Sequence, residues 1–178
     1  MFSSPALAAG PWKGKIIDIE TKGPLEGAVV LAVWERVYRT PAGPNSYFYE
    51  AKETLTDKEG RFEISAYSPI NLLPIISYIR GPSFTFFKPG YLSLSSVDFG
   101  EFFLEGAREA PLERKEIGGK IYRLAPGILE LPRLETREER IISLNSVEGF
   151  PIGYAPAHKI RKLLELIDME NKKLGFRR

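Results

Sequence analysis

The sequence feature that most limits the possible folds is the apolar run Ala28–Trp34 (AVVLAVW), the longest uninterrupted one in the chain. Its seven residues are mostly β-branched or small, and they are far fewer than the roughly 18 apolar residues of a membrane-spanning helix. Turn residues flank the run, with Thr21–Pro24 before it and Pro41–Asn45 after it. We therefore expect a strand buried on both faces in a soluble mature protein, with a loop at Pro41–Asn45.

Gly and Pro divide the rest of the chain into similarly short segments. The 178 residues include 16 Gly and 14 Pro, above the roughly 12% that these two residues usually contribute. The segments between them predict further strands at Lys13–Glu20, Tyr47–Thr56, Arg61–Ile64, Ser83–Phe87, Lys120–Leu124 and Ile128–Leu131. The turn Thr56–Gly60 predicts that Tyr47–Thr56 and Arg61–Ile64 pair as a β-hairpin. The fold class is therefore mainly β.

Helical patterns are concentrated near the C-terminus. Thr136 and Glu139 match a capping box, which predicts a short helix from there to about Asn145. Residues 156–174 predict an amphipathic helix with one apolar face, formed by Ile160, Leu163, Leu164, Ile167 and Leu174. Gly175 is typical of a helix C-terminal cap. We expect this helix to pack its apolar face on the sheet, although its basic polar face also allows attachment to a membrane surface or a helical partner.

Three motifs in the first half occur in an order that resembles carboxypeptidase regulatory-like domains. They are Gly14–Asp18 followed by Thr21 and Pro24–Val30, then Thr56-Asp57-x-x-Gly60-x-Phe62, and finally Lys88-Pro89-Gly90-Tyr91. The resemblance covers residues 13–94 and implies a Greek-key β-sandwich like that of transthyretin. Residues 1–12 are then an N-terminal tail. Residues 95–178 are an extension with a long loop, short strands, one or two helices and a C-terminal amphipathic helix packed on the sandwich.

The motif residues have structural roles in this interpretation. Gly27 allows a sharp turn into the buried strand where a side chain would clash, and Gly60 takes a positive φ. Asp57 caps its own turn through its carboxylate. Phe62 points into the core, while Gly90 forms a further turn and Tyr91 packs across an open end of the sandwich. We expect these six residues to be structural: Gly27, Asp57, Gly60, Phe62, Gly90 and Tyr91.

The composition excludes several kinds of chemistry. The chain has no cysteine, which excludes disulfides, thiolate catalysis and cysteine-ligated metals, and its one histidine, His158, cannot form a multi-imidazole zinc site alone. The net charge is +2, and the basic excess lies in residues 158–178, with seven basic and three acidic side chains. Nucleic-acid binders usually carry a basic face through the whole fold. We expect no catalytic residue, cofactor, metal or nucleic-acid partner.

The N-terminus suggests export. Ala6-Leu7-Ala8 followed by Ala9 has the small-x-small form that signal peptidases cut, although no basic start or long apolar stretch precedes it. One interpretation is the end of an export signal truncated upstream, with cleavage between Ala8 and Ala9. The other is a flexible N-terminus of small residues. We expect a periplasmic or extracellular protein.

The function favoured by the sequence is that of a non-catalytic exported module that binds another protein or a surface polymer. The aromatic run Tyr47-Phe48-Tyr49 is the candidate partner contact, because strand alternation cannot bury all three rings. The segment Glu101–Lys120 is a second candidate surface. One alternative is a structural subunit of an extracellular or envelope assembly that exchanges strands, with oligomerisation. A hydrolase of transthyretin-like fold is disfavoured, because His158 lies outside the matching region and the chain ends in Gly175-Phe176-Arg177-Arg178.

Overall fold

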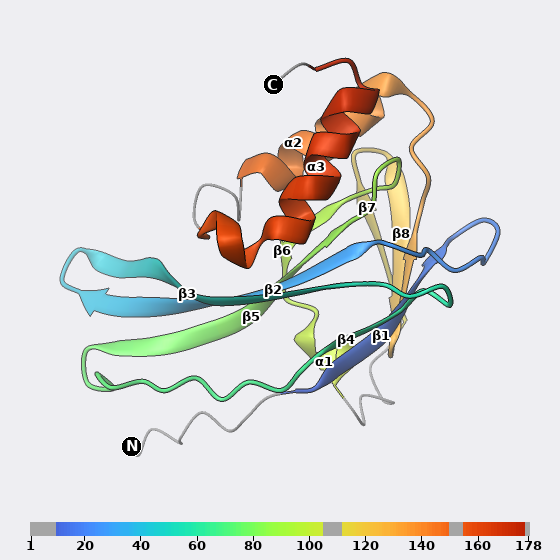
Figure 1. The fold of residues 1–178 in the computed structure, drawn as a ribbon. Coiled ribbons are helices and arrows are strands. Elements are labelled where there is room, and N and C mark those ends of the chain that lie inside the picture. Colours follow the sequence, from blue (N-terminus) through green and yellow to red (C-terminus); the bar gives the residue numbers. More distant parts are fainter. Residues whose placement is uncertain (1–9, 105–111, 150–154, 177–178) are drawn as a thin grey trace.

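A computed structural model of the chain describes residues 10–104, 112–149 and 155–176, and these residues form two β-sheets and a helical layer (Figure 1). The five-stranded sheet has the order β4 (Arg61–Ile64), β1 (Trp12–Asp18), β9 (Ile128–Leu131), β8 (Lys120–Ala125) and β7 (Glu113–Ile117). The four-stranded sheet has the order β3 (Gly43–Leu55), β2 (Val29–Thr40), β5 (Ser77–Phe87) and β6 (Leu94–Val97). The helical elements are α1 (Gly100–Phe103), α2 (Arg137–Gly149), the 3₁₀ helix η1 (Ala157–Lys159) and α3 (Arg161–Lys173). The predicted mainly β sandwich with C-terminal helices is confirmed.

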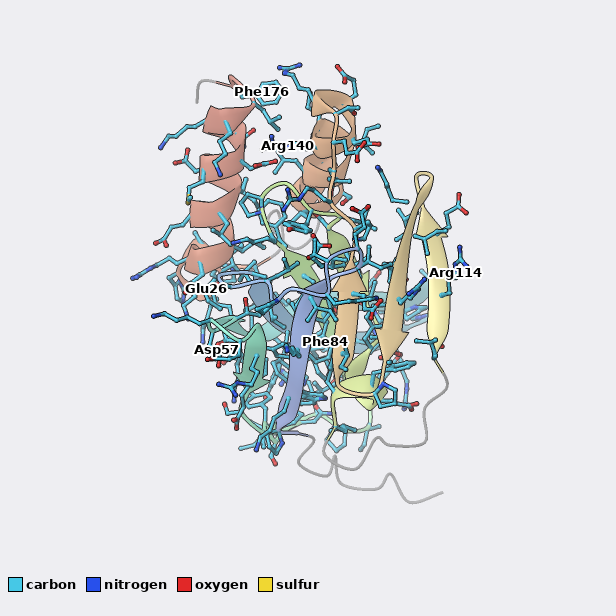
Figure 2. All side chains as sticks on the ribbon, turned by 90° about the vertical axis from the view of Figure 1, so that its right-hand side faces the viewer. Glu26, Asp57, Phe84, Arg114, Arg140 and Phe176 are labelled. Atoms are coloured by element: carbon cyan, nitrogen blue, oxygen red, sulfur yellow. The ribbon has the colours of Figure 1, made fainter. Side chains whose placement is uncertain are left out.

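Two hydrophobic cores lie on opposite faces of β2. Val30, Ala32 and Trp34 point between the two sheets, where Phe84 also lies (Figure 2). The alternate residues Val29, Leu31 and Val33 point the other way and pack against the helices. The predicted burial of this strand on both faces is confirmed, because Val29–Val33 are at most 1% exposed. The apolar run therefore sits at the centre of a three-layer protein.

The helical layer covers the outer face of the four-stranded sheet. Ile160, Leu163 and Ile167 pack in the outer core together with Leu144 and Val147 of α2. The predicted capping box is present, since the Glu139 N–H donates to Thr136 Oγ1 (3.1 Å) and the Thr136 N–H donates to a Glu139 carboxylate oxygen (3.2 Å).

A charged pair joins the two long helices. Arg140 donates two hydrogen bonds of 2.7 Å to the Glu170 carboxylate, whose side chain is only 2% exposed (Figure 2 labels Arg140). The pair holds α2 against α3 at a fixed spacing.

Residues 95–178 contribute strands as well as helices. β9 pairs in parallel with β1, from Lys15 opposite Ile128 to Asp18 opposite Leu131, and β8 and β7 continue the same sheet. The long surface loop that the sequence predicts over 95–119 contains strands β6 and β7, and the short helix predicted within Phe99–Leu104 is present as α1; residues 105–111 lie outside the described residues. The two halves of the chain are therefore joined within one sheet.

The predicted hairpin between the third and fourth strands is wrong. β3 pairs with β2, whereas β4 pairs with β1 in the opposite sheet. Thr56 fixes the departure point, because its hydroxyl accepts the Ala28 N–H (2.8 Å) and donates to the Leu25 carbonyl. The turn after Thr56 therefore carries the chain across the sandwich rather than back along the same sheet.

The expected loop at Pro41–Asn45 is also shorter than predicted. β3 begins at Gly43, so Pro44 and Asn45 belong to the ladder with β2. A proline fits there because β3 is the edge of its sheet and needs no donor on its outer side.

The four-stranded sheet extends beyond the five-stranded one. β2, β3 and β5 have 12, 13 and 11 residues, whereas β1 and β9 have 7 and 4, and Figure 1 shows the β2–β3 hairpin and the start of β5 projecting away from β1. The connection between β4 and β5, residues 65–76, runs along this projecting part. The Tyr49 hydroxyl donates to the Ile70 carbonyl (2.9 Å), and Lys52 Nζ binds the Ala66 carbonyl (3.1 Å). The sheet is thereby given an inner cover where its partner sheet ends.

Within residues 10–104, 112–149 and 155–176, no helix combines the length and apolar character that crossing a membrane requires.

Candidate functional site

The candidate contact Tyr47-Phe48-Tyr49 divides between three environments. Tyr47 is 57% exposed, and its ring lies edge-on to that of Tyr38 at 5.6 Å. Phe48 packs against the outer core under the helices, and Tyr49 packs against the sandwich core. The register between β2 and β3 shifts at Tyr49, so this residue is the extra residue of a β-bulge. Only Tyr47 of the three offers most of its ring to a partner.

Aliphatic side chains that the sequence analysis did not single out surround this part of the fold. The connection 65–76 exposes five of them: Ile70, Leu72, Leu73, Ile75 and Ile76. With the exposed residues Tyr47, Tyr78 and Arg39 they form what we call the distal surface. Hydrogen bonding and ring contacts connect its parts, since the Arg39 N–H donates to the Ile76 carbonyl (2.9 Å) and the Arg39 guanidinium lies 5.5 Å from the Tyr78 ring centre. A sequence signal was available, because residues 64–79 contain no charged side chain.

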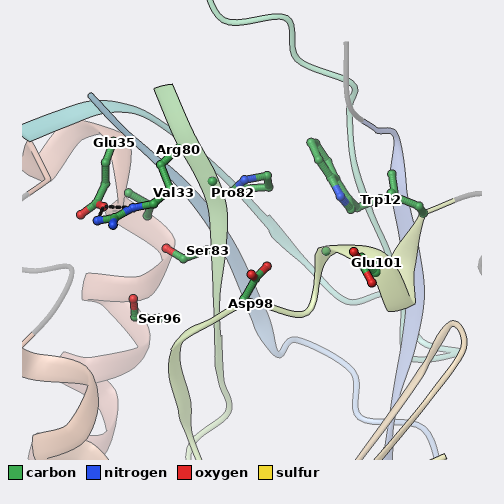
Figure 3. Close-up of a pocket in the computed structure, with 12 residues that line it drawn as sticks. Trp12, Val33, Glu35, Arg80, Pro82, Ser83, Ser96, Asp98 and Glu101 are labelled. Atoms are coloured by element: carbon green, nitrogen blue, oxygen red, sulfur yellow. Dashed lines mark hydrogen bonds and ion pairs between the residues drawn. The ribbon is translucent and has the colours of Figure 1, made fainter. Parts of the chain in front are cut away.

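A pocket of about 500 Å³ lies beside β5, and we call it the β5 pocket (Figure 3). It forms because β6 pairs with β5 only around Phe84 and Phe86, which leaves the preceding part of β5 without a neighbour on that side among the described residues. Strands β1, β2, β5 and β6, helix α1 and the residues around α1 all contribute to its wall. The lining residues are Trp12, Val33, Glu35, Arg80, Gly81, Pro82, Ser83, Ser96, Asp98, Gly100, Glu101 and Leu104.

Backbone geometry on β5 shapes this pocket. The pairing of β5 with β2 shifts register between Val33 and Glu35, so that Gly81 and Pro82 bulge from the strand. A Cβ atom on Gly81 would lie 2.8 Å from the Val33 carbonyl oxygen, and its φ is +112°. A glycine is therefore required for β5 to approach β2 this closely at the bulge.

The polar groups of the β5 pocket are mainly hydrogen-bond acceptors. Glu35 is engaged by the Arg80 guanidinium in an ion pair, and Arg80 also donates to Ser46 Oγ (2.9 Å). Asp98 and Glu101 are exposed, and neither forms an ion pair or a hydrogen bond with another described residue. Figure 3 shows both carboxylates on the pocket side of the segment after β6. The arrangement suits a ligand that brings hydroxyl, ammonium or guanidinium donors.

Three of the predicted structural residues form one compact turn. Asp57 Oδ1 accepts the backbone N–H groups of Glu59 (3.0 Å) and Arg61 (2.8 Å), as a self-capping turn requires. Gly60 has φ +75°, and an added Cβ would lie 2.5 Å from the Ile16 carbonyl oxygen. Phe62 follows in the sandwich core, 5.2 Å from the ring of Phe103.

The other three predicted structural residues lie in separate turns, of which that at Gly27 adjoins the first, since the Gly27 N–H donates to the Thr56 carbonyl (2.9 Å). Gly27 has φ +67° but no close neighbour except Lys88 Nζ at 3.6 Å, so its backbone conformation rather than the expected clash calls for glycine. Gly90 has φ +83° in open space. Tyr91 donates its hydroxyl to Asp18 Oδ2 (3.1 Å), and the Arg133 guanidinium lies 5.6 Å from the Tyr91 ring centre.

Asp18, the hydrogen-bond partner of Tyr91, is buried, and its carboxyl group has a shifted pKa. Burial raises its pKa, but hydrogen bonds from the backbone N–H groups of Thr21 and Glu20, both 2.9 Å, and from Tyr91 more than offset that effect. The pKa therefore lies below its ordinary value of 3.8, and Asp18 is an ionised turn cap at neutral pH.

The described residues form no candidate metal site, and their histidine lies away from the β5 pocket. His, Asp and Glu side chains among them form no group of three or more that could hold a metal ion. His158 is exposed on η1, in the helical layer, and does not line the β5 pocket. The segment Glu101–Lys120 lies partly outside the described residues, and its described part ends in the strand pair β7–β8.

No protein-family model, curated protein or solved structure matches this chain.

Proposed function

We propose that this chain is a non-catalytic exported β-sandwich module that binds another protein or a surface polymer. The observation that carries the proposal is the β5 pocket, whose volume of about 500 Å³ is in the range of ligand sites, roughly 300–1,000 Å³. Asp98 and Glu101 offer carboxylate oxygens that no other described residue occupies. A hydroxyl-rich polymer or a basic protein segment supplies the donors that these oxygens accept.

Binding rather than catalysis is supported by how the pocket's charges are used. Glu35, the carboxylate on the strand wall, is held by Arg80 and Arg80 in turn by Ser46, so this group is committed to an ion pair. The residues that line the pocket include no histidine, lysine or cysteine, so the bases and nucleophiles that these three residue types supply are absent from the lining. The resemblance of residues 13–94 to carboxypeptidase regulatory-like domains supports the same proposal, because those modules are usually non-catalytic and often exported.

The alternative of an assembly subunit that exchanges strands is less well supported by the sheet edges. Along β3, the bulge at Tyr49 interrupts the ladder and the Glu50 carboxylate accepts the Ala51 N–H (2.8 Å). Along β5, Pro82 lacks the N–H that an added strand needs. Interrupted edges of this kind oppose strand addition.

In-cell photocrosslinking tests the proposed function. A photoreactive phenylalanine analogue replaces Leu104, which lines the pocket and carries no group that the proposal uses, and a matched variant carries it at Lys58, an exposed turn residue outside the pocket. We expect a discrete protein or polymer adduct from position 104 and none from position 58, and we expect the adduct to be lost when Asp98→Asn is added. Sequencing of the mature N-terminus in the same material tests export. Equal products from both positions, or a product unaffected by Asp98→Asn, would refute the pocket as the contact.

A further inference from the structure

The distal surface is an apolar patch that projects from the fold. Ile75 is 86% exposed, Leu72 78% and Ile70 68%, and all three belong to one connection of twelve residues, 65–76. Single exposed aliphatic residues are ordinary, but a contiguous projecting group marks an interaction site. The inner side of the same connection packs on Tyr49 through its backbone, so the side chains that remain outside are not needed by the sandwich core.

Several backbone groups of this connection are already hydrogen-bonded internally. Asn71 Nδ2 donates to the Ser77 carbonyl (2.7 Å), and Asn71 Oδ1 accepts the Leu73 N–H (3.2 Å) and the Ser77 hydroxyl (3.1 Å). The Ser77 N–H donates to the Leu73 carbonyl (3.0 Å), and the Ile76 carbonyl accepts from Arg39. Each backbone group satisfied in this way lowers the cost of bringing the loop to the boundary of headgroups and acyl chains.

The rim of the distal surface is aromatic and basic. The exposed rings of Tyr47 and Tyr78 carry the apolar body and polar hydroxyl that favour the headgroup level of a bilayer. Arg39 is exposed and forms no ion pair with a described residue, whereas Arg36 is half-buried, with its guanidinium 5.0 Å from the Tyr49 ring centre. No acidic residue occurs in 36–49 or in 64–79. The charge on the rim is therefore only positive, and a positive rim complements an anionic surface.

We propose that the distal surface attaches the protein peripherally to an anionic phospholipid bilayer, with the aliphatic side chains of residues 70–76 inserted at the boundary of headgroups and acyl chains. A projecting aliphatic loop, exposed tyrosine rings and an exposed arginine without a carboxylate partner are the three components of such an attachment. The proposal goes beyond the proposed function, because it uses a different surface from the β5 pocket. The two sites are compatible, since one holds the module at a membrane and the other binds its partner.

Vesicle co-sedimentation tests the attachment with the full chain. The probes are vesicles of phosphatidylcholine alone and vesicles of phosphatidylcholine mixed with phosphatidylglycerol. Leu72→Ser with Ile75→Ser removes two inserted side chains without changing charge, and Arg39→Gln removes a charge without changing the loop. Ile142→Ser is the matched control, because Ile142 is 68% exposed on α2, in the helical layer. Tryptophan emission and circular dichroism verify that each variant is folded.

We expect the wild-type protein to bind the anionic vesicles more strongly than the neutral ones. The loop double variant should bind roughly 100-fold more weakly, since each aliphatic side chain contributes about tenfold. Arg39→Gln should lower binding several-fold and reduce the preference for anionic lipid, an effect that added salt should reproduce. Ile142→Ser should bind like the wild type. The proposal is overturned if the wild type does not bind, if the loop variant binds equally well, or if the surface instead mediates self-association that the loop variant abolishes.

Discussion

Replacing Gly60 by alanine should be far more costly than the same change at Gly127, although both glycines have nearly the same backbone conformation. Their φ angles are +75° and +73°. The carbonyl of each glycine also accepts a hydrogen bond from β1: the Gly60 carbonyl accepts the Ile16 N–H (2.9 Å), and the Gly127 carbonyl accepts the Lys15 N–H (2.8 Å). They differ in the space that an added methyl group meets, and this makes Gly127 a matched control.

At Gly60 the added Cβ would lie 2.5 Å from the Ile16 carbonyl oxygen and 3.2 Å from the Leu25 nitrogen. Those two atoms form a hydrogen bond of 3.0 Å that joins β1 to the segment before β2. At Gly127 no atom lies within 4 Å of the added Cβ. The methyl group at Gly60 must therefore displace a buried backbone hydrogen bond, and the methyl group at Gly127 displaces nothing.

The two costs can be worked out separately. A non-glycine residue in the left-handed region costs roughly 1–2 kcal/mol. A buried backbone group left without its partner costs about 1–3 kcal/mol more. Gly127→Ala should then lower the free energy of unfolding by about 1–2 kcal/mol, and Gly60→Ala by about 2–5 kcal/mol. For a domain whose total stability is about 5–15 kcal/mol, the second loss is large.

Urea unfolding followed by tryptophan emission measures both changes. Trp12 and Trp34 lie together in the sandwich core, with ring centres 5.7 Å apart, so their emission reports unfolding of the core that β1 closes. The reasoning is refuted if the two variants differ by less than about 0.5 kcal/mol, which is the usual effect of an unimportant surface change. It is also refuted if Gly127→Ala is the more destabilising of the two.

Two further predictions concern charged groups. Arg140→Met should lower the free energy of unfolding by about 3 kcal/mol, because it leaves the buried Glu170 carboxylate without its partner. Adding Glu170→Leu should restore most of that loss. The prediction is contradicted if urea unfolding shows that the double variant loses as much stability as the two single variants together. Asp18 has a pKa below 3.8 in the folded protein, so its contribution to stability is present above that pH and is lost as the pH falls through the folded-state value. Asp18→Asn should therefore flatten the loss of stability on acidification below pH 3.8, and a slope equal to that of the wild type would show that Asp18 does not contribute.

The elements that were predicted correctly are those whose evidence is local. The run Ala28–Trp34 has no polar position, so it predicts a strand covered on both sides. The periodicity of Ile160, Leu163 and Ile167 predicts a helix with one buried face, and both features are present. The turn chemistry of Asp57 and Gly60 was also correct in its geometry. Each of these inferences needs only residues that are near one another in the chain.

The pairing of strands required information that the local sequence does not contain. A turn between β3 and β4 was predicted correctly, but the turn residues do not determine that β4 joins β1 across the sandwich. The parallel pairing of β9 with β1 brings together residues more than a hundred positions apart. The sequence predicted neither the β5 pocket nor the full distal surface. The pocket is assembled from five elements, and their spatial arrangement depends on strand pairing. The exposure of the distal residues depends on where the partner sheet ends, which the sequence of residues 65–76 does not contain.

The two bulges explain why both surfaces occur in this part of the fold. The bulge at Tyr49 on β3 and the bulge at Gly81–Pro82 on β5 both lie beside Trp34 and Glu35 of β2. Paired bulges at one level bend a sheet and increase its twist. Before this level the sheet is enclosed between the two cores; beyond it the sheet projects past its partner and carries the distal surface. The β5 pocket is lined by Glu35 and Arg80–Ser83 and therefore lies at the bend itself. The bulges thus open the pocket, direct the distal surface away from the sandwich and interrupt both sides of the projecting part of the four-stranded sheet.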